Sequence, residues 1–281
     1  MKGRRLDLAL TRAGHARSRT HAQRIIAEGR ARIDGRPALR ASQPVPDGAR
    51  LSVDDVPDGV EYASRAAHKL AGILTDLDVD PAGCRCLDAG ASTGGFTDVL
   101  LRRGAAQVIA VDIGHDQLAE HLVGDPRIEV RDGTSVRDLT ATSVRRPVDL
   151  LVADLSFISL RTVLAPLASV VRPGGALLLM VKPQFEVGRE RLPRTGVVTD
   201  PALHRAAVAD VVAAAHEQGL QLQAVGPSPL PGQEGNREFF VHLVNTLPGS
   251  GAGASACAMI ERAMVAGSAR TAPRTHQDGG Q

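Results

Sequence analysis

A lysine and an aspartate each follow an apolar segment of this chain, and together they could move a proton. Asp154 comes directly after the run 148–153, and Lys182 comes directly after the run 176–181. We interpret both runs as adjacent parallel strands, whose carboxyl ends meet at one rim of a sheet. Lys182 and Asp154 should therefore approach each other there, either as catalytic groups or as a structural ion pair.

A glycine-rich turn lies at residues 87–98, Leu-Asp-Ala-Gly-Ala-Ser-Thr-Gly-Gly-Phe-Thr-Asp. It follows a short apolar run and precedes a helical pattern, so it predicts a strand, a turn and a helix start. Such a turn presents bare backbone N–H groups to a polar or anionic ligand. The glycines at 90, 94 and 95 do not fit the G-x-G-x-x-G pattern of dinucleotide sites. The turn indicates a nucleotide-like ligand without naming it, and a purely structural turn is the alternative.

Two further acids follow the next two predicted strands. Asp112 ends the run 107–111 and lies 22 positions beyond Gly90. An acid at this offset can accept hydrogen bonds from both hydroxyls of a ribose, or it can cap the following segment. Asp132 comes after the third strand and could accept from an adenine amino group.

Composition limits the class of protein. The 281 residues suffice for one large domain, or for a medium domain with a small one, and 43% are apolar. Three cysteines, Cys84, Cys86 and Cys257, favour neither a disulfide framework nor a metal cluster. The chain shows no apolar run of membrane-spanning length and no secretory signal. We therefore expect a monomeric, cytoplasmic protein without membrane or metal partners.

Positive charge is concentrated at the N-terminus. Residues 1–46 contain eleven Lys or Arg and three acids, a net charge of +8, whereas the rest of the chain carries −6. A compact basic module attached to a mildly acidic body predicts a docking site for a polyanion. A merely solvated basic surface is the alternative.

The hydrophobic pattern predicts two different regions. Two short helices, the second capped by Ser18, a hairpin around Asp34-Gly35 and a strand near 50–53 form a small α+β region. From residue 84 the chain alternates strand and helix, which predicts a mostly parallel seven-stranded sheet covered on both faces. Strands are expected at 84–88, 107–112, 127–130, 148–153, 175–181, 220–225 and 238–244. Helices are expected near 96–103, 115–122, 159–171 and 201–218.

The N-terminal pattern resembles the alpha-L RNA-binding module of the ribosomal protein S-four type. The resemblance rests on Arg5-Leu6-Asp7, on Ala16-Arg17-Ser18-Arg19, on Ala22, Ile26 and Gly29, and on Ile33-Asp34-Gly35. It implies that the basic module binds RNA.

The larger region resembles the TlyA family, rRNA ribose 2′-O-methyltransferases with an FtsJ-like domain that were historically labelled haemolysins. The motifs that carry this resemblance are 64–70 (Ser-Arg-x-x-His-Lys-Leu), 88–98, 154–159 (Asp-Leu-Ser-Phe-Ile-Ser) and 182–188 (Lys-Pro-Gln-Phe-Glu-Val-Gly). It implies a Rossmann-like class I methyltransferase fold. It further implies methylation of cytidine ribose in 16S and 23S rRNA, on a nucleotide flipped out of its helix. The linker departs from relatives, with Val-Glu-Tyr-Ala at 60–63 where they can carry Arg-Ala-Trp-Val.

The resemblance also assigns residues. The family's catalytic tetrad falls on Lys69, Asp154, Lys182 and Glu238. S-adenosylmethionine is the implied cofactor, expected around Asp88, Gly90, Ala91, Ser92, Gly94, Gly95, Phe96, Asp112, Asp132 and Asp154. Contacts to rRNA are expected from Arg4, Arg5, Arg17, Arg19, Arg40, Arg137 and Phe157, the last by stacking on a flipped base or, alternatively, by packing in the core.

We therefore expect an RNA-binding domain at 1–56, a linker at 57–64, a methyltransferase domain at 65–247 and a disordered tail at 248–281, with one short helix possible at 256–265. The alternative function is a non-catalytic rRNA-binding or ribosome-assembly factor. A haemolysin is the weaker alternative, because no membrane-active segment is visible.

Overall fold

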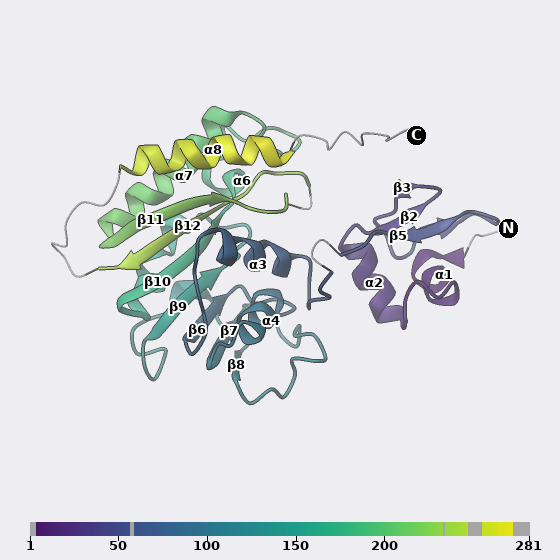
Figure 1. Ribbon diagram of the computed structural model, residues 1–281, viewed down its shortest axis with the longest axis horizontal. Coiled ribbons are helices and arrows are strands. Elements are labelled where there is room, and N and C mark those ends of the chain that lie inside the picture. The colour runs from purple at the N-terminus through teal and green to yellow at the C-terminus, as the bar shows by residue number, and fades with distance from the viewer. Residues whose placement is uncertain (1–3, 57–58, 233, 247–254, 272–281) are drawn as a thin grey trace, which may run out of the picture. The chain divides into compact units, whose positions relative to one another are not determined.

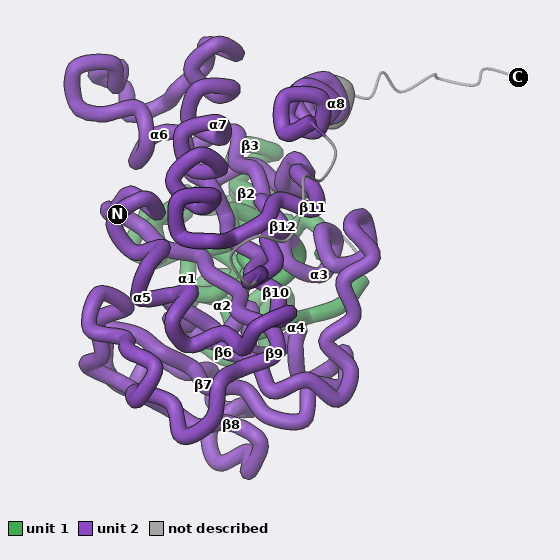
Figure 2. Tube along the Cα trace, turned by 90° about the vertical axis from the view of Figure 1, so that its left-hand side faces the viewer, with its two compact units in different colours: residues 1–68 green, residues 69–281 purple. Residues whose placement is uncertain are grey.

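The computed structural model describes residues 4–56, 59–232, 234–246 and 255–271. The chain forms two compact units, residues 1–68 and residues 69–281, which are coloured separately in Figure 2. The division falls inside helix α3 (Ala66–Asp76), a few residues after the linker expected at 57–64.

The N-terminal unit is a small α+β fold. Its helices α1 and α2 pack against one another around a core that includes Leu6, Leu10, Ile25 and Ile26. The Ser18 hydroxyl accepts from His21 N at 3.1 Å and caps α2, as its sequence position predicts. A hairpin turns at Asp34-Gly35, where both residues have positive φ. The elements are β1 (Arg4–Arg5), α1 (Leu6–Arg12), α2 (Arg19–Ala27), β2 (Ala31–Ile33), β3 (Arg36–Pro37), β4 (Pro44–Val45) and β5 (Leu51–Val53).

The second unit is built on a seven-stranded sheet in the order β11-β12-β10-β9-β6-β7-β8. The five strands from β10 to β8 are parallel, and β12 runs antiparallel between β10 and β11. The predicted, mostly parallel sheet is therefore confirmed. The strands are β6 (Arg85–Ala89), β7 (Gln107–Val111), β8 (Ile128–Arg131), β9 (Val148–Ala153), β10 (Val171–Val181), β11 (Leu220–Pro227) and β12 (Phe239–Asn245).

Helices cover both faces of this sheet (Figures 1 and 2). One face carries α3 and α4, and the other carries α5 and α7. The central strands are apolar at successive positions because both faces are buried. Leu151, Leu179 and Val241 belong to the core cluster that includes residues of α5 and α7. The remaining helices are α4 (Gly95–Arg102), η1 (Val136–Asp138), η2 (Leu160–Thr162), α5 (Leu164–Ser169), α6 (Pro183–Glu186), α7 (Pro201–Glu217) and α8 (Ala256–Thr271).

Two expectations differ from the structure. Residues 115–122 form turns rather than a helix, because the segment has too few apolar positions to bury a helical face. The short helix held possible at 256–265, within the tail expected beyond 248, is present as α8, which extends to residue 271. Met259, Ile260 and Met264 of α8 are buried in the main core, and α8 packs on α7 and β11. The rest of the expected tail, 248–254 and 272–281, lies outside the described residues.

Within the described residues, we find no helix that combines the length and the apolar character needed to cross a membrane.

Candidate active site and cofactor site

The glycine turn follows β6 and is held tightly against the end of β9. Gly90 has φ +83° and Gly94 has φ +85°, conformations that side chains rarely adopt. A Cβ atom on Gly90 would lie 2.8 Å from the carbonyl oxygen of Asp154, and one on Gly94 would lie 2.5 Å from a methyl of Leu122. Both positions therefore require glycine, and the turn lies directly beside Asp154.

Asp88 lies at the end of β6 and is completely buried. Burial raises the pKa of its carboxyl to about 7, although hydrogen bonds from the Thr97 side chain and backbone oppose the shift. Thr97 Oγ1 donates to Asp88 Oδ2 at 2.7 Å, whereas Oδ1 is buried and accepts from no group among the described residues. Such an acceptor, left open in the protein interior, indicates a missing donor.

Asp112 lies beside the glycine turn, at the end of β7. Its carboxylate accepts from Ser92 N at 2.9 Å and from Gly114 N at 2.7 Å, so it fixes the path of the turn. Each oxygen keeps a second lone pair for a ligand hydroxyl. Asp132 is exposed and accepts from Asp116 N at 2.9 Å.

Phe96 was expected near the cofactor, but its side chain is turned into the core. Its side chain is buried and stacks on Phe240 of β12, with ring centroids 6.3 Å apart. Only its backbone, in the first turn of α4, remains for a ligand. The N-cap of this helix is Gly94, which has no side chain to cap the first N–H groups.

Lys182 and Asp154 meet at the carboxyl rim of the sheet, as the strand pattern predicts. Lys182 Nζ lies 2.7 Å from Asp154 Oδ1 and also donates to Ser156 Oγ at 2.9 Å. Lys182 is buried, with 9% of its surface exposed, so its ammonium group depends on these two partners. Ser156 was not singled out from the sequence, although its position in the 154–159 motif was available as a signal.

Lys69 and Glu238 form a second buried ion pair. Lys69 Nζ donates to Glu238 Oε2 at 2.5 Å, and both residues are less than a tenth exposed. A Cβ atom on Gly232 would lie 2.8 Å from Glu238 Oε1, so this glycine makes room for the carboxylate. Val181 of β10 pairs with Phe239 of β12, which brings the next residues outward, Lys182 and Glu238, to the same rim.

Phe157 follows Asp154 in the loop after β9. Its side chain is 91% exposed, and its ring centroid lies 5.2 Å from that of Phe185. The alternative that Phe157 packs in the core is therefore wrong. Its φ of +63° is unusual for an aromatic residue, because Cβ is crowded in this conformation.

Several of the expected RNA contacts in the N-terminal unit are tied to carboxylates. Asp7 is fully buried and accepts from Arg5 at 2.9 Å and from Arg19 at 3.0 Å. The Arg5 side chain, with help from Arg19 and Gln23, holds the pKa of Asp7 well below its usual range. Asp7 belongs to the Arg5-Leu6-Asp7 motif, but no spacing in the sequence predicts that it binds both arginines.

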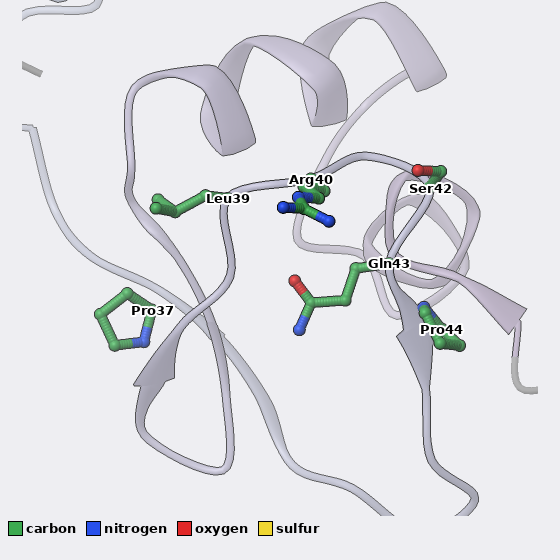
Figure 3. Close-up of a pocket in the computed structure, with 6 residues that line it drawn as sticks. All are labelled: Pro37, Leu39, Arg40, Ser42, Gln43 and Pro44. Carbon is green, nitrogen blue, oxygen red and sulfur yellow. The ribbon is translucent and has the colours of Figure 1, made fainter. Parts of the chain in front are cut away.

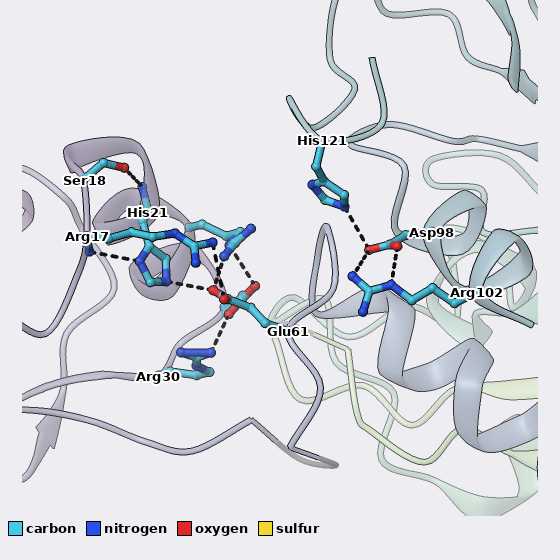
Figure 4. A network of polar contacts seen from close by, with 10 residues as sticks. Arg17, Ser18, His21, Arg30, Glu61, Asp98, Arg102 and His121 are labelled. Atoms are coloured by element: carbon cyan, nitrogen blue, oxygen red, sulfur yellow. Dashed lines mark hydrogen bonds and ion pairs between the residues drawn. The ribbon is translucent and has the colours of Figure 1, made fainter. Parts of the chain in front are cut away.

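The carboxylate of Glu61, in the same unit, contacts basic side chains of α2 and of the segment that precedes it. Glu61 contacts Arg17 at 3.4 Å, His21 at 2.8 Å and Arg24 (Figure 4). Burial is the main cause that lowers the pKa of His21, so this ring carries less charge near neutral pH than an exposed histidine. Glu61 lies within the linker segment that departs from the family pattern.

The other expected RNA contacts are exposed. Arg4 and Arg40 lie in the N-terminal unit, and Arg137 lies in η1. Arg40 borders a shallow hollow together with Leu39 and Gln43 (Figure 3). Their positions are compatible with contact to phosphates.

The second unit thus has the architecture of a nucleotide-binding α/β fold, with a glycine turn and two Lys–carboxylate ion pairs at the rim where such folds bind ligands. This combination defines the class of Rossmann-like methyltransferases. The FtsJ-like methyltransferase family matches residues 62–245, and the S4 domain family matches residues 4–51. The chain belongs to the TlyA family of FtsJ-like methyltransferases that carry an S4 domain.

Known relatives support this assignment. The chain is 48% identical over 240 residues to the 16S/23S rRNA (cytidine-2′-O)-methyltransferase TlyA of Mycobacterium tuberculosis, covering 85% of this chain and 89% of the relative. It is 33% identical over 184 residues to the 23S rRNA (cytidine-2′-O)-methyltransferase TlyA of Campylobacter jejuni, covering 65% and 71%. A solved structure from Streptococcus thermophilus that carries the name hemolysin matches with TM-score 0.75 and 30% identity, covering 96% and 97% of the two chains.

The methyltransferase family implies S-adenosylmethionine as cofactor, and the residues at the glycine turn fit this molecule. The open Oδ1 of Asp88 can accept from its amino group, and the carboxylate oxygens of Asp112 keep lone pairs that suit a ribose hydroxyl. Because Gly90 has no Cβ atom, a ligand can approach the backbone of the turn next to Asp154.

Proposed function

We propose that this protein transfers a methyl group from S-adenosylmethionine to the ribose 2′-hydroxyl of cytidine in 16S and 23S rRNA. The observation that carries the proposal is the partly buried Lys182–Asp154 pair, which lies at the sheet rim next to the glycine turn. The 48% identity to a curated relative with this activity supports the same substrate. The basic N-terminal unit supplies the affinity for RNA.

The chemistry requires an oxygen to be positioned and its proton to be removed. S-adenosylmethionine, when bound, supplies an activated methyl group for an in-line displacement. The uncharged amine of Lys182 takes the proton of the 2′-hydroxyl as that oxygen attacks, and the lysine becomes an ammonium. Asp154 holds the lysine in place and stabilises its charged form, at 2.7 Å. Ser156 accepts from the same amine and fixes its direction.

The second ion pair, Lys69–Glu238, acts from the same rim. Lys69 adds positive charge near the developing oxyanion, and Glu238 prevents that lysine from rotating away. Because β10 and β12 are paired up to Val181 and Phe239, Lys182 and Glu238 each directly adjoin a paired strand, and Lys69 lies within α3.

A target nucleotide inside an rRNA helix must be flipped out to reach this rim. Phe157 is exposed, follows Asp154 closely and can stack on the extruded base. Arg137 and the N-terminal arginines Arg4, Arg17 and Arg40 are exposed and would hold phosphates.

The test is methylation of ribosomal subunits with labelled cofactor, followed by mass mapping of rRNA fragments. Wild-type protein should label a cytidine ribose in each subunit, and Lys182→Ala should abolish labelling while RNA binding survives. Lys182→Arg is the matched control for charge, because it can keep the pair with Asp154 but cannot serve as a base at neutral pH. Labelling at wild-type rate by Lys182→Ala would remove this lysine from the mechanism. Cofactor binding without any methylation would favour the non-catalytic RNA-binding alternative.

A further inference from the structure

The loop after β9 and the segment after β10 are joined by a series of contacts beyond the end of the sheet. Asp154 and Ser156 both contact Lys182, and Phe157 contacts Phe185. The series ends at Glu186, the last residue of α6. The two segments therefore leave the sheet side by side and stay connected along their length.

Glu186 makes the strongest of these connections. Ser159 Oγ donates to Glu186 Oε2 at 2.5 Å, and the backbone N–H of Leu160 donates to Oε1 at 2.7 Å. Arg161 adds an ion pair at 3.5 Å and a hydrogen bond to the Glu186 carbonyl at 3.2 Å. Both carboxylate oxygens are thus occupied by the first residues of η2, the element that closes the loop.

The burial of Glu186 makes this arrangement specific. Its surface is only 2% exposed, and burial raises the pKa of its carboxyl. A buried carboxylate is costly to desolvate unless hydrogen bonds compensate, so the loop must keep its donors in place.

The loop has a strained backbone at Phe157, which surrounding contacts must keep in place. Phe157 has φ +63°, a conformation that residues other than glycine rarely adopt, because the Cβ atom is crowded there. Such strain persists only where surrounding contacts determine the backbone. The Lys182 contacts fix the loop on one side of Phe157, and the Glu186 contacts fix it on the other.

We propose that Glu186 is a positioning residue that fixes the loop 154–159 and thereby sets the geometry of Asp154 and Phe157 against Lys182. Nothing in the proposed chemistry requires Glu186 to touch substrate or cofactor. The inference rests on the proposed function and deepens it, because it adds a residue that the tetrad does not include.

Two substitutions separate hydrogen bonding from charge. Glu186→Ala removes both acceptors and leaves Leu160 N and Ser159 Oγ without partners. Glu186→Gln can keep both contacts, because its oxygen accepts from Leu160 N and its amide nitrogen can donate to the Ser159 hydroxyl. Glu190→Ala is the matched control, since Glu190 is an exposed acid four residues further on.

The experiment measures kcat and KM for ribosomal subunits, the affinity for S-adenosylmethionine by calorimetry, and amide hydrogen exchange by mass spectrometry. Glu186→Ala should lower kcat by about 10- to 100-fold, the effect of misplacing reacting groups by about 1 Å. Exchange should accelerate in peptides covering 154–161 and stay unchanged at 88–95. Cofactor affinity should stay within about twofold, and Glu186→Gln should recover most of kcat.

Two outcomes overturn the inference. If Glu186→Ala keeps wild-type kcat and KM in an active preparation, the loop does not depend on this contact. If Glu186→Gln loses as much kcat as Glu186→Ala, the charge itself is used and a positioning role is wrong. Inactivity of the wild-type protein on both subunits would instead count against the proposed function. Should Glu186→Ala fail to fold, Ser159→Ala tests the same contact, with a smaller fall in kcat expected.

Discussion

Lys69 and Glu238 are 169 positions apart in the chain, yet Lys69 Nζ donates to Glu238 Oε2 at 2.5 Å in the interior of the methyltransferase unit. This contact joins helix α3 to the residue that precedes the last strand. It is therefore a structural constraint as well as part of the candidate active site.

Breaking the pair should be costly. Lys69→Ala leaves a buried, uncompensated carboxylate and should lower the free energy of unfolding by about 3–5 kcal/mol. The double variant Lys69→Met/Glu238→Leu should recover much of that stability but none of the methylation. Urea denaturation of the single and double variants measures both the loss of stability and its recovery. The exposed Arg205–Glu261 pair is the control, because solvent screens it and Glu261→Ala should leave the free energy of unfolding nearly unchanged. Comparable losses at both pairs would contradict the structural role.

Asp88 should make stability and cofactor affinity depend on pH. Its folded-state pKa of about 7 exceeds the usual value of 3.8, so the folded protein binds a proton more tightly than the unfolded chain. The free energy of unfolding should therefore fall as pH rises from about 4 to about 7, by up to about 4 kcal/mol. Asp88→Asn should flatten this dependence. The measurement is urea denaturation of both proteins at pH 5 and pH 8. An equal change in the free energy of unfolding between these pH values for wild type and Asp88→Asn would refute the prediction.

Cofactor binding should show the opposite trend. An ammonium group against Asp88 Oδ1 favours the ionised carboxylate, so affinity for S-adenosylmethionine should rise with pH up to about 7 and then level. Calorimetry across this range checks the trend, and Asp88→Asn should bind weakly at every pH. A pH-independent affinity in the wild type would exclude Asp88 as the partner of the amino group.

The backbone conformation of Phe157 should lower the stability of the fold, whereas its exposed ring should assist methylation. At φ +63°, Phe157→Gly should be more stable than Phe157→Ala by about 1 kcal/mol, because only glycine adopts this conformation without strain. Both variants should lose methylation through a higher KM or lower kcat, since neither can stack on a base. Thermal unfolding and steady-state kinetics provide the two measurements. Unchanged kinetics for both variants would show that the exposed ring is not used.

Glu61 should weaken RNA binding in the wild-type protein. Its carboxylate engages Arg17 and Arg24, which would otherwise face phosphates (Figure 4). Glu61→Gln should raise rRNA affinity several-fold at low salt and steepen the dependence on salt concentration. Asp47→Asn, an equal change of charge at an exposed acid of the same unit, is the control. Equal gains for both variants would reduce the effect to net charge.

Much of the fold could be predicted because local signals and the global fold agree. The Ser18 cap, the glycine turn at 90–95 and the apolar strands each leave a short-range pattern, and the approach of Lys182 to Asp154 follows from the rule for strand ends. The contacts that the sequence does not predict join residues far apart in the chain or depend on how helices pack. The Lys69–Glu238 contact depends on how α3 packs, and the engagement of Arg5 and Arg19 by Asp7 depends on the packing of α1 against α2. No spacing in the sequence encodes either.

The placement of β12 between β10 and β11 also has a consequence for biosynthesis. A ribosome must release almost the whole methyltransferase region before this strand can insert, so Glu238 joins Lys69 last. Until then β10 is an uncovered edge, open to pairing with other chains. The N-terminal unit, which is made first and has its own small core, does not depend on this late step.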